Sequence, residues 1–276
     1  MPFHSTSAYI HRWLQSQSAV KEESITDWLL FNISQQTDMV YYKTFTRNEE
    51  AVNGSDWEWW IIADGNFGIQ AYRFLVQAKK IKSKADNYPL LSYSNRNGMQ
   101  IDLLIKSAEN KNAMPLYAYY SCCKPDINNQ ITNIDYISEE LLKWCQDCLN
   151  GCFFASAFAV KNYVFNKPKR IIYDNKLIDR SFGLSLLDLL FSSETKSVCK
   201  TFENLNEHFI HSSKLNNNNN NTENDRGIIY HLKDIPSYVK VLIERSDNLD
   251  WYENEFHSDI KNLSGVAIID ARGNCD

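Results

Sequence analysis

The sequence contains no apolar stretch long enough to cross a lipid bilayer. Its longest apolar run, residues 151–160, has ten residues, whereas a membrane-spanning helix needs roughly 18. The first residues, MPFHSTSAYIHRWL, show no basic start followed by an apolar segment, which predicts that no secretory signal peptide is present. We therefore expect no association with membranes, and we expect the longest apolar run to be a buried strand or helix.

An excess of basic residues is also absent. The 29 Lys and Arg residues are outnumbered by 34 Asp and Glu residues, which gives a net charge of −5. Proteins that coat nucleic acid non-specifically are normally basic, so any nucleic-acid contact must be confined to a local patch. The 43% hydrophobic and 23% charged residues are close to the globular average and exclude a disordered or collagen-like chain.

The length and the cysteines set further limits. The 276 residues are enough for one large domain or two small ones with a buried core. The seven cysteines are an odd number and include the adjacent pair Cys122 and Cys123. Without an export signal, this pattern is typical of reduced thiols, and it predicts a cytoplasmic protein.

Hydrophobic periodicity predicts a series of helices and strands. Ile25, Trp28, Leu29 and Ile33 recur at helical spacing and predict a helix that starts near Glu22. Clusters of β-branched and aromatic residues predict strands at residues 40–45, 57–63, 69–79 and 116–121. Amphipathic spacing predicts a further helix at residues 99–108. Farther along we predict helices at 138–149, 184–191 and 238–244, a strand at 266–270, and either a strand or a helix at 152–165.

This order of elements predicts an α/β fold with three segments. Residues 1–20 are expected to form an arm or a short helix, residues 21–165 the α/β core, and residues 166–276 a helical C-terminal extension. Within the extension, the polar stretch 212–226, SSKLNNNNNNTENDR, cannot bury apolar surface and is predicted to be a disordered loop.

Two of the predicted strands carry polar side chains that can meet. Side chains alternate along a strand, so Asp56 and Glu58 share one face, and Gln77 and Lys79 share a face of the next strand. If the two strands form a hairpin through residues 64–68, these groups come together. Carboxylate and amide oxygens are ligands suited to Mg²⁺, and a metal there could polarise a phosphoryl oxygen and activate water.

This arrangement resembles the PD-(D/E)xK nuclease superfamily, which includes restriction-type endonucleases. Asp56 matches the acidic residue of that family, and Gln77-Ala78-Lys79 matches its (E/Q)xK element in the Gln form found in Mrr-type enzymes. Glu22 or Glu23 matches the Glu that a preceding helix supplies in the family. The resemblance covers about residues 20–125, and within the superfamily the sequence looks like an uncharacterised bacterial family.

The resemblance implies a restriction-endonuclease-like core, in which a central mixed sheet is flanked by helices, and a function as a metal-dependent DNA nuclease in restriction or antiphage defence. Mg²⁺ or Mn²⁺ would be the cofactor, with Asp56, Gln77 and Glu22 or Glu23 as ligands, and Lys79 would position the attacking water. The catalytic set is expected to be Asp56, Glu58, Gln77 and Lys79. Because Gln lacks the charge of Glu, another acid must compensate, and the candidates are Glu22, Glu23, Glu50 and Glu58.

A local positive patch follows the same strand. Residues 72–84 contain no acid but hold five basic residues, which would attract a phosphate backbone. Apart from Lys79, we expect these to contact DNA: Arg73, Lys80, Lys82 and Lys84. A homodimer and a partner subunit from a defence system are both left open as assemblies.

Two other classes of function remain open from the sequence. One is a non-catalytic module on the same fold that binds nucleic acid or protein, because the Gln form weakens the metal site and the chain is acidic. The other is a thiol-dependent enzyme that uses Cys122 or Cys123 with a histidine.

Overall fold

A computed structural model describes most of the first 122 residues of the chain and several separate segments after them. The described residues are 2–45, 54–65, 68–81, 94–95, 98–122, 151–166, 181–184, 187–188, 229–231, 235–244, 255–260 and 263–272. Several sequence predictions therefore lie outside them: the helix at 138–149, most of the helix at 184–191, the loop at 212–226, and the residues Glu50, Lys82 and Lys84.

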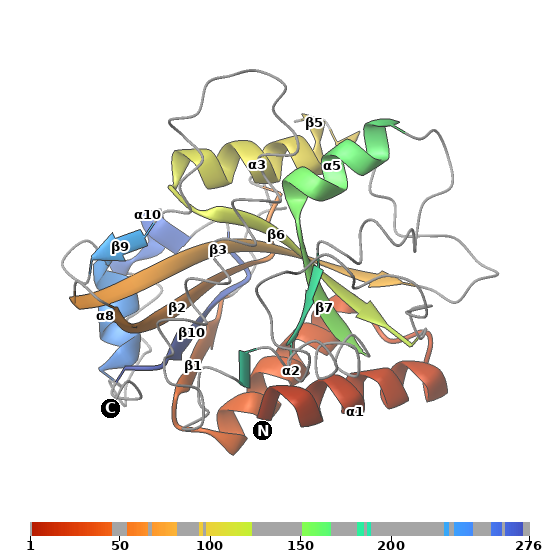
Figure 1. Cartoon of the computed structure of the whole chain (residues 1–276), viewed down its shortest axis with the longest axis horizontal. Coiled ribbons are helices and arrows are strands. Elements are labelled where there is room, and N and C mark those ends of the chain that lie inside the picture. The colour runs from red at the N-terminus through yellow and green to blue at the C-terminus, as the bar shows by residue number, and fades with distance from the viewer. Residues whose placement is uncertain are drawn as a thin grey trace.

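The centre of the fold is an eight-stranded mixed sheet (Figure 1). Its order is β1-β10-β2-β3-β6-β7-β8, and β9 pairs with one end of β3. The β10–β2 and β3–β6 pairs are parallel, and the others are antiparallel. The strands are β1 (Val40–Thr44), β2 (Trp57–Gly65), β3 (Gly68–Ile81), β6 (Met114–Ser121), β7 (Cys152–Ser156), β8 (Ser181–Gly183), β9 (Ile229–His231) and β10 (Gly265–Asp270). A separate two-stranded ribbon is formed by β4 (Ser94–Asn95) and β5 (Gly98–Met99).

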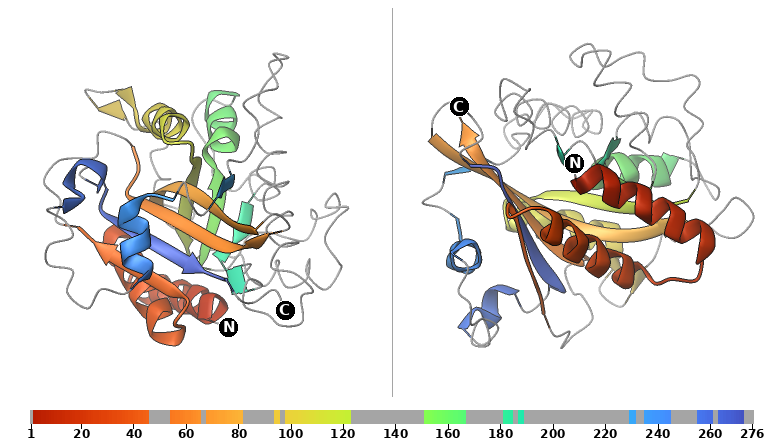
Figure 2. Two further views of the ribbon diagram at one scale, coloured as in Figure 1. Left: turned by 90° about the vertical axis from the view of Figure 1, so that its left-hand side faces the viewer. Right: turned by 90° about the horizontal axis from the view of Figure 1, so that it is seen from below.

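Helices cover both faces of the sheet (Figures 1 and 2). One face carries α1 (Pro2–Ser16) and α2 (Glu22–Gln36). The opposite face carries two groups, α3 (Gln100–Asn110) with α5 (Ala157–Asn166), and α8 (Ser237–Ile243) with α10 (His257–Ile260). The structure is therefore an α/β fold with a mixed sheet between helical layers. None of the described helices combines the length and apolar character that spanning a membrane requires.

The strand β2 is central and buried on both faces. Trp57, Trp59 and Ile61 pack towards α1 and α2, whereas Trp60 and Ile62 pack towards α8 and α10. Strands buried on both faces have near-continuous apolar sequences, which explains the run of tryptophans. The predicted hairpin of β2 and β3 is confirmed, because the two strands pair in antiparallel register.

Most predicted elements in the described residues are confirmed, with boundaries shifted by a few residues. They include α2, β1, β2, β3, α3, β6, α8 and β10. The ambiguous stretch 152–165 contains both of its alternatives, since β7 runs directly into α5.

The N-terminal segment is a packed helix rather than an arm. Phe3, Ile10 and Leu14 of α1 are almost completely buried and belong to the same core cluster as α2 and the sheet. Asp188 binds the first turn of α1, because its two carboxylate oxygens accept the N–H groups of Phe3 (3.0 Å) and His4 (2.7 Å). A carboxylate at a helix N-terminus satisfies otherwise unpaired N–H groups and interacts favourably with the helix dipole.

The prediction of a helical C-terminal extension is wrong for the described residues. The strand β10 lies between β1 and β2 in the sheet, parallel to β2 and antiparallel to β1. In addition, β8 pairs with β7 and β9 pairs with β3. The described strands after residue 165 therefore belong to the same sheet that the first half of the chain begins.

Candidate active site

The candidate active site lies at an edge of β3 that β2 does not reach. β2 pairs with β3 only up to Val76, whereas β3 extends farther along β6. Beyond that point the N–H of Ala78 donates to Asp56 Oδ2 (3.1 Å), and the N–H of Lys80 donates to Glu22 Oε1 (2.7 Å). Two residues along a strand span about 6.6 Å, so the two carboxylates occupy successive positions on one strand edge.

Asp56 is held by its main chain as well as by its side chain. Its N–H donates to the carbonyl oxygen of Val76 (2.9 Å), and its own carbonyl oxygen accepts the N–H of Ser264 (2.8 Å). The side chain is half-buried. These contacts fix Asp56 between β3 and the start of β10.

Gln77 connects Asp56 to helix α3. The side chain is 2% exposed, and its Nε2 donates to Asp56 Oδ2 at 2.6 Å. Its Oε1 accepts a hydrogen bond from Nε2 of Gln100, the first residue of α3, at 2.8 Å. The orientation of the Gln77 amide follows from this network, since the carboxylate requires a donor.

Lys79 lies on the same face of β3 as Gln77, two residues along the strand. It is half-buried, and its ammonium group forms no hydrogen bond or ion pair with the described residues. Lys79 and Gln77 thus lie on one face of β3, and the side chain of Gln77 contacts Asp56.

The negative charge of this strand edge contributes to the raised pKa values of two buried tyrosines of β6. Burial raises the pKa of Tyr117, and the charges of Asp56 and Asp102 raise it further. Burial also raises the pKa of Tyr120, with smaller contributions from several groups that include both Asp56 and Glu22. Both carboxylates thus act on the same buried hydroxyl group.

Glu23 and Lys80 are placed differently from Glu22 and Lys79. Glu23 is exposed and lines a groove with Thr44 and Trp57 on the α2 side of the sheet. Lys80 points to the face of α1 and α2, where its Nζ donates to main-chain carbonyl oxygens of the α1–α2 turn. Of the two helix glutamates, the structure therefore brings Glu22 to the strand edge.

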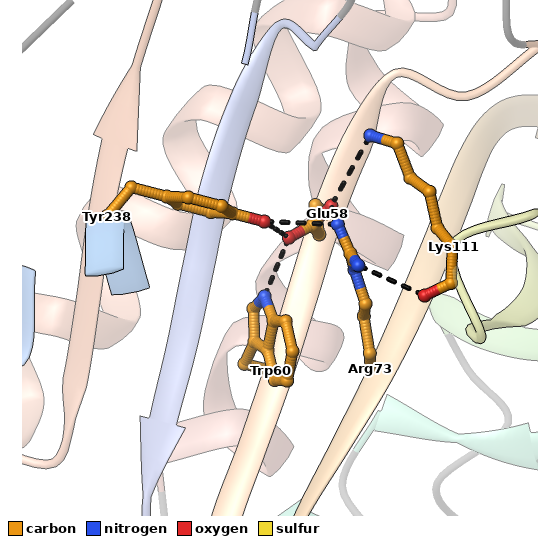
Figure 3. A network of polar contacts seen from close by, with 5 residues as sticks. All are labelled: Glu58, Trp60, Arg73, Lys111 and Tyr238. Carbon is orange, nitrogen blue, oxygen red and sulfur yellow. Dashed lines mark hydrogen bonds and ion pairs between the residues drawn. The ribbon is translucent and has the colours of Figure 1, made fainter. Parts of the chain in front are cut away.

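A second polar cluster, the Glu58 network, joins the two helical groups on one face of the sheet (Figure 3). Glu58 is completely buried, and its Oε1 accepts hydrogen bonds from Trp60 Nε1 (2.7 Å) and from the hydroxyl group of Tyr238 in α8. Its Oε2 accepts one from Arg73 (2.7 Å) and lies 3.8 Å from Lys111 Nζ.

Arg73 makes the remaining contacts of the Glu58 network through its guanidinium group. The guanidinium group also donates to the carbonyl oxygen of Lys111 (3.0 Å) and to the hydroxyl group of Tyr238 (3.1 Å). Burial lowers the pKa of the Lys111 ammonium group, and the negative charge of Glu58 partly offsets this. Both oxygens of Glu58 and both terminal nitrogens of Arg73 are thus engaged inside the protein. This burial argues against the catalytic role predicted for Glu58 and the DNA contact predicted for Arg73.

Sequence reasoning missed two residues of the site, Gln100 and Gly54. Gln100 holds the oxygen of Gln77, but an isolated amide at the start of a helix gives no signal of this contact. Gly54 has a φ of 73°, and a Cβ atom there would lie 2.6 Å from the carbonyl oxygen of Gln100. Glycine at this position therefore allows the first turn of α3 to approach Asp56.

Replacing Gly54 with alanine is expected to lower the free energy of unfolding by about 1–3 kcal/mol, because the new Cβ would collide with main-chain atoms of α3. Chemical denaturation measures this loss. Gly98→Ala is the matched control, since Gly98 also has a positive φ but has nothing within 4 Å of the added Cβ. Equal destabilisation by both substitutions would contradict the importance of the close approach.

The oxygens at the strand edge have the chemistry of a Mg²⁺ site. The described residues hold no cluster of three or more His, Cys, Asp or Glu side chains that could bind a metal. A site with Asp56 and Glu22 would therefore need the amide oxygen of Gln77 as a further protein ligand. That oxygen accepts a hydrogen bond from Gln100, so the amide must turn before it can face a cation. Carboxylate and amide oxygens are the type of ligand that Mg²⁺ prefers.

Comparison with known protein families gives a match, which covers nearly the whole chain. A family model matches residues 3–273. The chain belongs to DUF6615, a family of unknown function. The DUF6615 match begins in α1 and extends past β10, so both ends of the sheet assembly belong to one family unit. No curated protein and no solved structure matches the chain.

Proposed function

We propose that this member of DUF6615 is a metal-dependent nuclease that hydrolyses phosphodiester bonds, with DNA as its substrate. The observation that carries the proposal is Lys79, a half-buried lysine whose ammonium group meets no polar partner among the described residues, on the same face of β3 as Gln77, which is hydrogen-bonded to Asp56. Ordinary surface lysines are solvated, and buried ones are normally paired. A restriction-endonuclease-like core, a cytoplasmic location and a role in restriction or antiphage defence are parts of the same proposal.

In the proposed reaction, Asp56, Glu22 and the turned amide of Gln77 would hold Mg²⁺ or Mn²⁺. The cation, when bound, supplies Lewis-acid stabilisation of the charge that develops on the phosphoryl group. Lys79 hydrogen-bonds the attacking water and places its positive charge near the phosphoryl oxygens. Gln100 releases Gln77 when the amide turns, and it can then donate to another acceptor.

One observation favours a second candidate function, a non-catalytic nucleic-acid-binding module. Gln77 donates to Asp56 and accepts from Gln100, so both ends of its amide are satisfied without a cation. A binding module would keep this closed network and would use Lys79 only to contact phosphate. The two candidates differ in whether divalent cations bind at Asp56.

The test is incubation of the purified chain with plasmid DNA, single-stranded DNA and RNA in the presence of Mg²⁺, Mn²⁺ or a chelator. The proposed nuclease cleaves at least one of these substrates with either cation and none in the chelator. Binding of nucleic acid without cleavage under any of these conditions would favour the binding module.

Replacing Asp56 with asparagine is expected to reduce the cleavage rate by at least about 100-fold, the scale on which removal of an important electrostatic group acts. The amide oxygen can still accept the N–H of Ala78, so the fold should be kept while a charged ligand is lost. Calorimetric titration with Mn²⁺ should show weakened binding. Asp102→Asn is the control, because Asp102 is a half-buried acid of α3 paired with Lys161. A folded Asp56→Asn protein with normal cleavage would contradict the assigned site.

A further inference from the structure

An aromatic groove lies between α1 and α2. It has a volume of about 420 Å³ and is lined by Tyr9, Arg12, Trp13 and Ser16 of α1 and Trp28 of α2. This volume is within the roughly 300–1,000 Å³ of typical small-ligand sites. We call it the α1–α2 groove.

The rings of the groove are arranged around an exposed face. Trp28 meets Trp13 edge to face at 5.6 Å and Tyr9 at 6.2 Å between ring centroids. Tyr9 is 50% exposed, whereas Tyr117, Tyr119 and Tyr120 of β6 are buried. The guanidinium carbon of Arg12 lies 4.6 Å from the centroid of the Tyr9 ring, so a cationic plane and an aromatic ring stack at the rim.

Arg12 gives the groove a positive charge at its α1 wall. The side chain is exposed, and residues 2–21 contain no Asp or Glu, whereas the acids of α2 are Glu22, Glu23 and Asp27. The turn after α1 is fastened to β3, because Nζ of Lys80 donates to the carbonyl oxygens of Ser18 and Val20. The groove is therefore connected through this short turn to the strand edge that carries Lys79.

We infer that the α1–α2 groove binds an unpaired nucleobase, with Arg12 contacting the phosphate attached to it. Aromatic rings and arginine planes stack on any base, and Arg also binds phosphate oxygens. That the ligand is a nucleic acid rests on the proposed function, whereas the existence of the groove does not depend on it. The base can belong to a single strand or to a free nucleotide. The tryptophans Trp57, Trp59 and Trp60 cannot serve this purpose, because they are buried in the core.

The test compares the binding of two short fluorescent single strands in the absence of Mg²⁺, one with normal bases and one with abasic sugars. The wild type is expected to bind the strand with bases about tenfold more tightly, which is the effect of one stacked base. Tyr9→Ala should lose this preference, and Arg12→Ala should weaken binding of both strands. Phe31→Ala is the matched control, since Phe31 is a similarly exposed ring on α2 outside the groove (52% exposed).

The outcomes separate this inference from the proposed function. Equal binding of both strands by the wild type, or an unchanged preference in Tyr9→Ala, overturns the base site even if the protein cleaves DNA. A preference lost in Tyr9→Ala supports the base site even if no cleavage occurs, and in that case the nuclease proposal fails alone. Direct binding of adenosine monophosphate, measured by calorimetry, with no binding of either strand would support a base site that takes free nucleotides and would overturn the single-strand source.

Discussion

A Lys79→Ala protein is expected to fold normally and to cleave DNA at least about 100-fold more slowly than the wild type. The substitution removes a charge that acts on the developing phosphoryl charge, and such groups contribute mainly in the transition state. The core should be little affected, because Val76 and Ala78 of the same strand pack on the opposite face. Binding of DNA measured without turnover should fall only modestly, since one phosphate contact is a small part of the total.

The measurement is plasmid cleavage in Mg²⁺ or Mn²⁺, with folding checked by circular dichroism. Lys106→Ala is the matched control, because it removes the same charge from an exposed position on α3. A similar loss of rate in both variants would indicate a general charge effect. Normal cleavage by a folded Lys79→Ala protein would rule out the assigned role of the lysine.

Replacing Glu58 with alanine is expected to lower the free energy of unfolding by about 3–5 kcal/mol, which is the usual cost of removing one partner from a buried ion pair. Arg73 would remain buried at 11% side-chain exposure without its carboxylate, and Trp60 and Tyr238 would each lose an acceptor. Denaturant unfolding followed by tryptophan fluorescence measures the loss.

A double-mutant cycle distinguishes this network from ordinary packing. If Glu58 and Arg73 act as a pair, the double variant Glu58→Ala with Arg73→Ala should be less destabilised than the sum of the two single variants. Strict additivity would show that the ion pair contributes little and that the cost comes from lost packing alone. Full stability of Glu58→Ala with loss of DNA cleavage would instead favour a catalytic role for Glu58.

The sequence predicted the strands and one face of the site because both depend on local patterns. Alternation places Asp56 opposite β3 and places Gln77 and Lys79 on one face, and the apolar runs mark β2, β3 and β6. The pairing of Glu58 with Arg73 could not be predicted in the same way. It depends on the register of β2 against β3, which sets Trp60 opposite Arg73, and register has no signal in either strand alone.

The structure of the two ends of the chain was harder to predict, for related reasons. The sequence left an arm and a short helix open at the N-terminus, because two buried positions of α1 are Thr6 and Ser7, which interrupt the apolar pattern. The strand β10 was predicted, but its place between β1 and β2 depends on contacts with residues more than 200 positions earlier. Such long-range pairing leaves no trace in the local periodicity from which the extension was predicted.

The central position of β10 has a consequence for biosynthesis. From the end of β2 at Gly65 to the start of β10 at Gly265, a ribosome adds 200 residues, which takes roughly 10–40 s at about 5–20 residues per second. During that interval the nascent chain carries β1 and β2 with the strand between them missing, and unpaired strand edges invite aggregation. Asp56 also lacks the N–H of Ser264 until then. The strand edge that holds Asp56 and Lys79 therefore reaches its final geometry only after translation has passed β10.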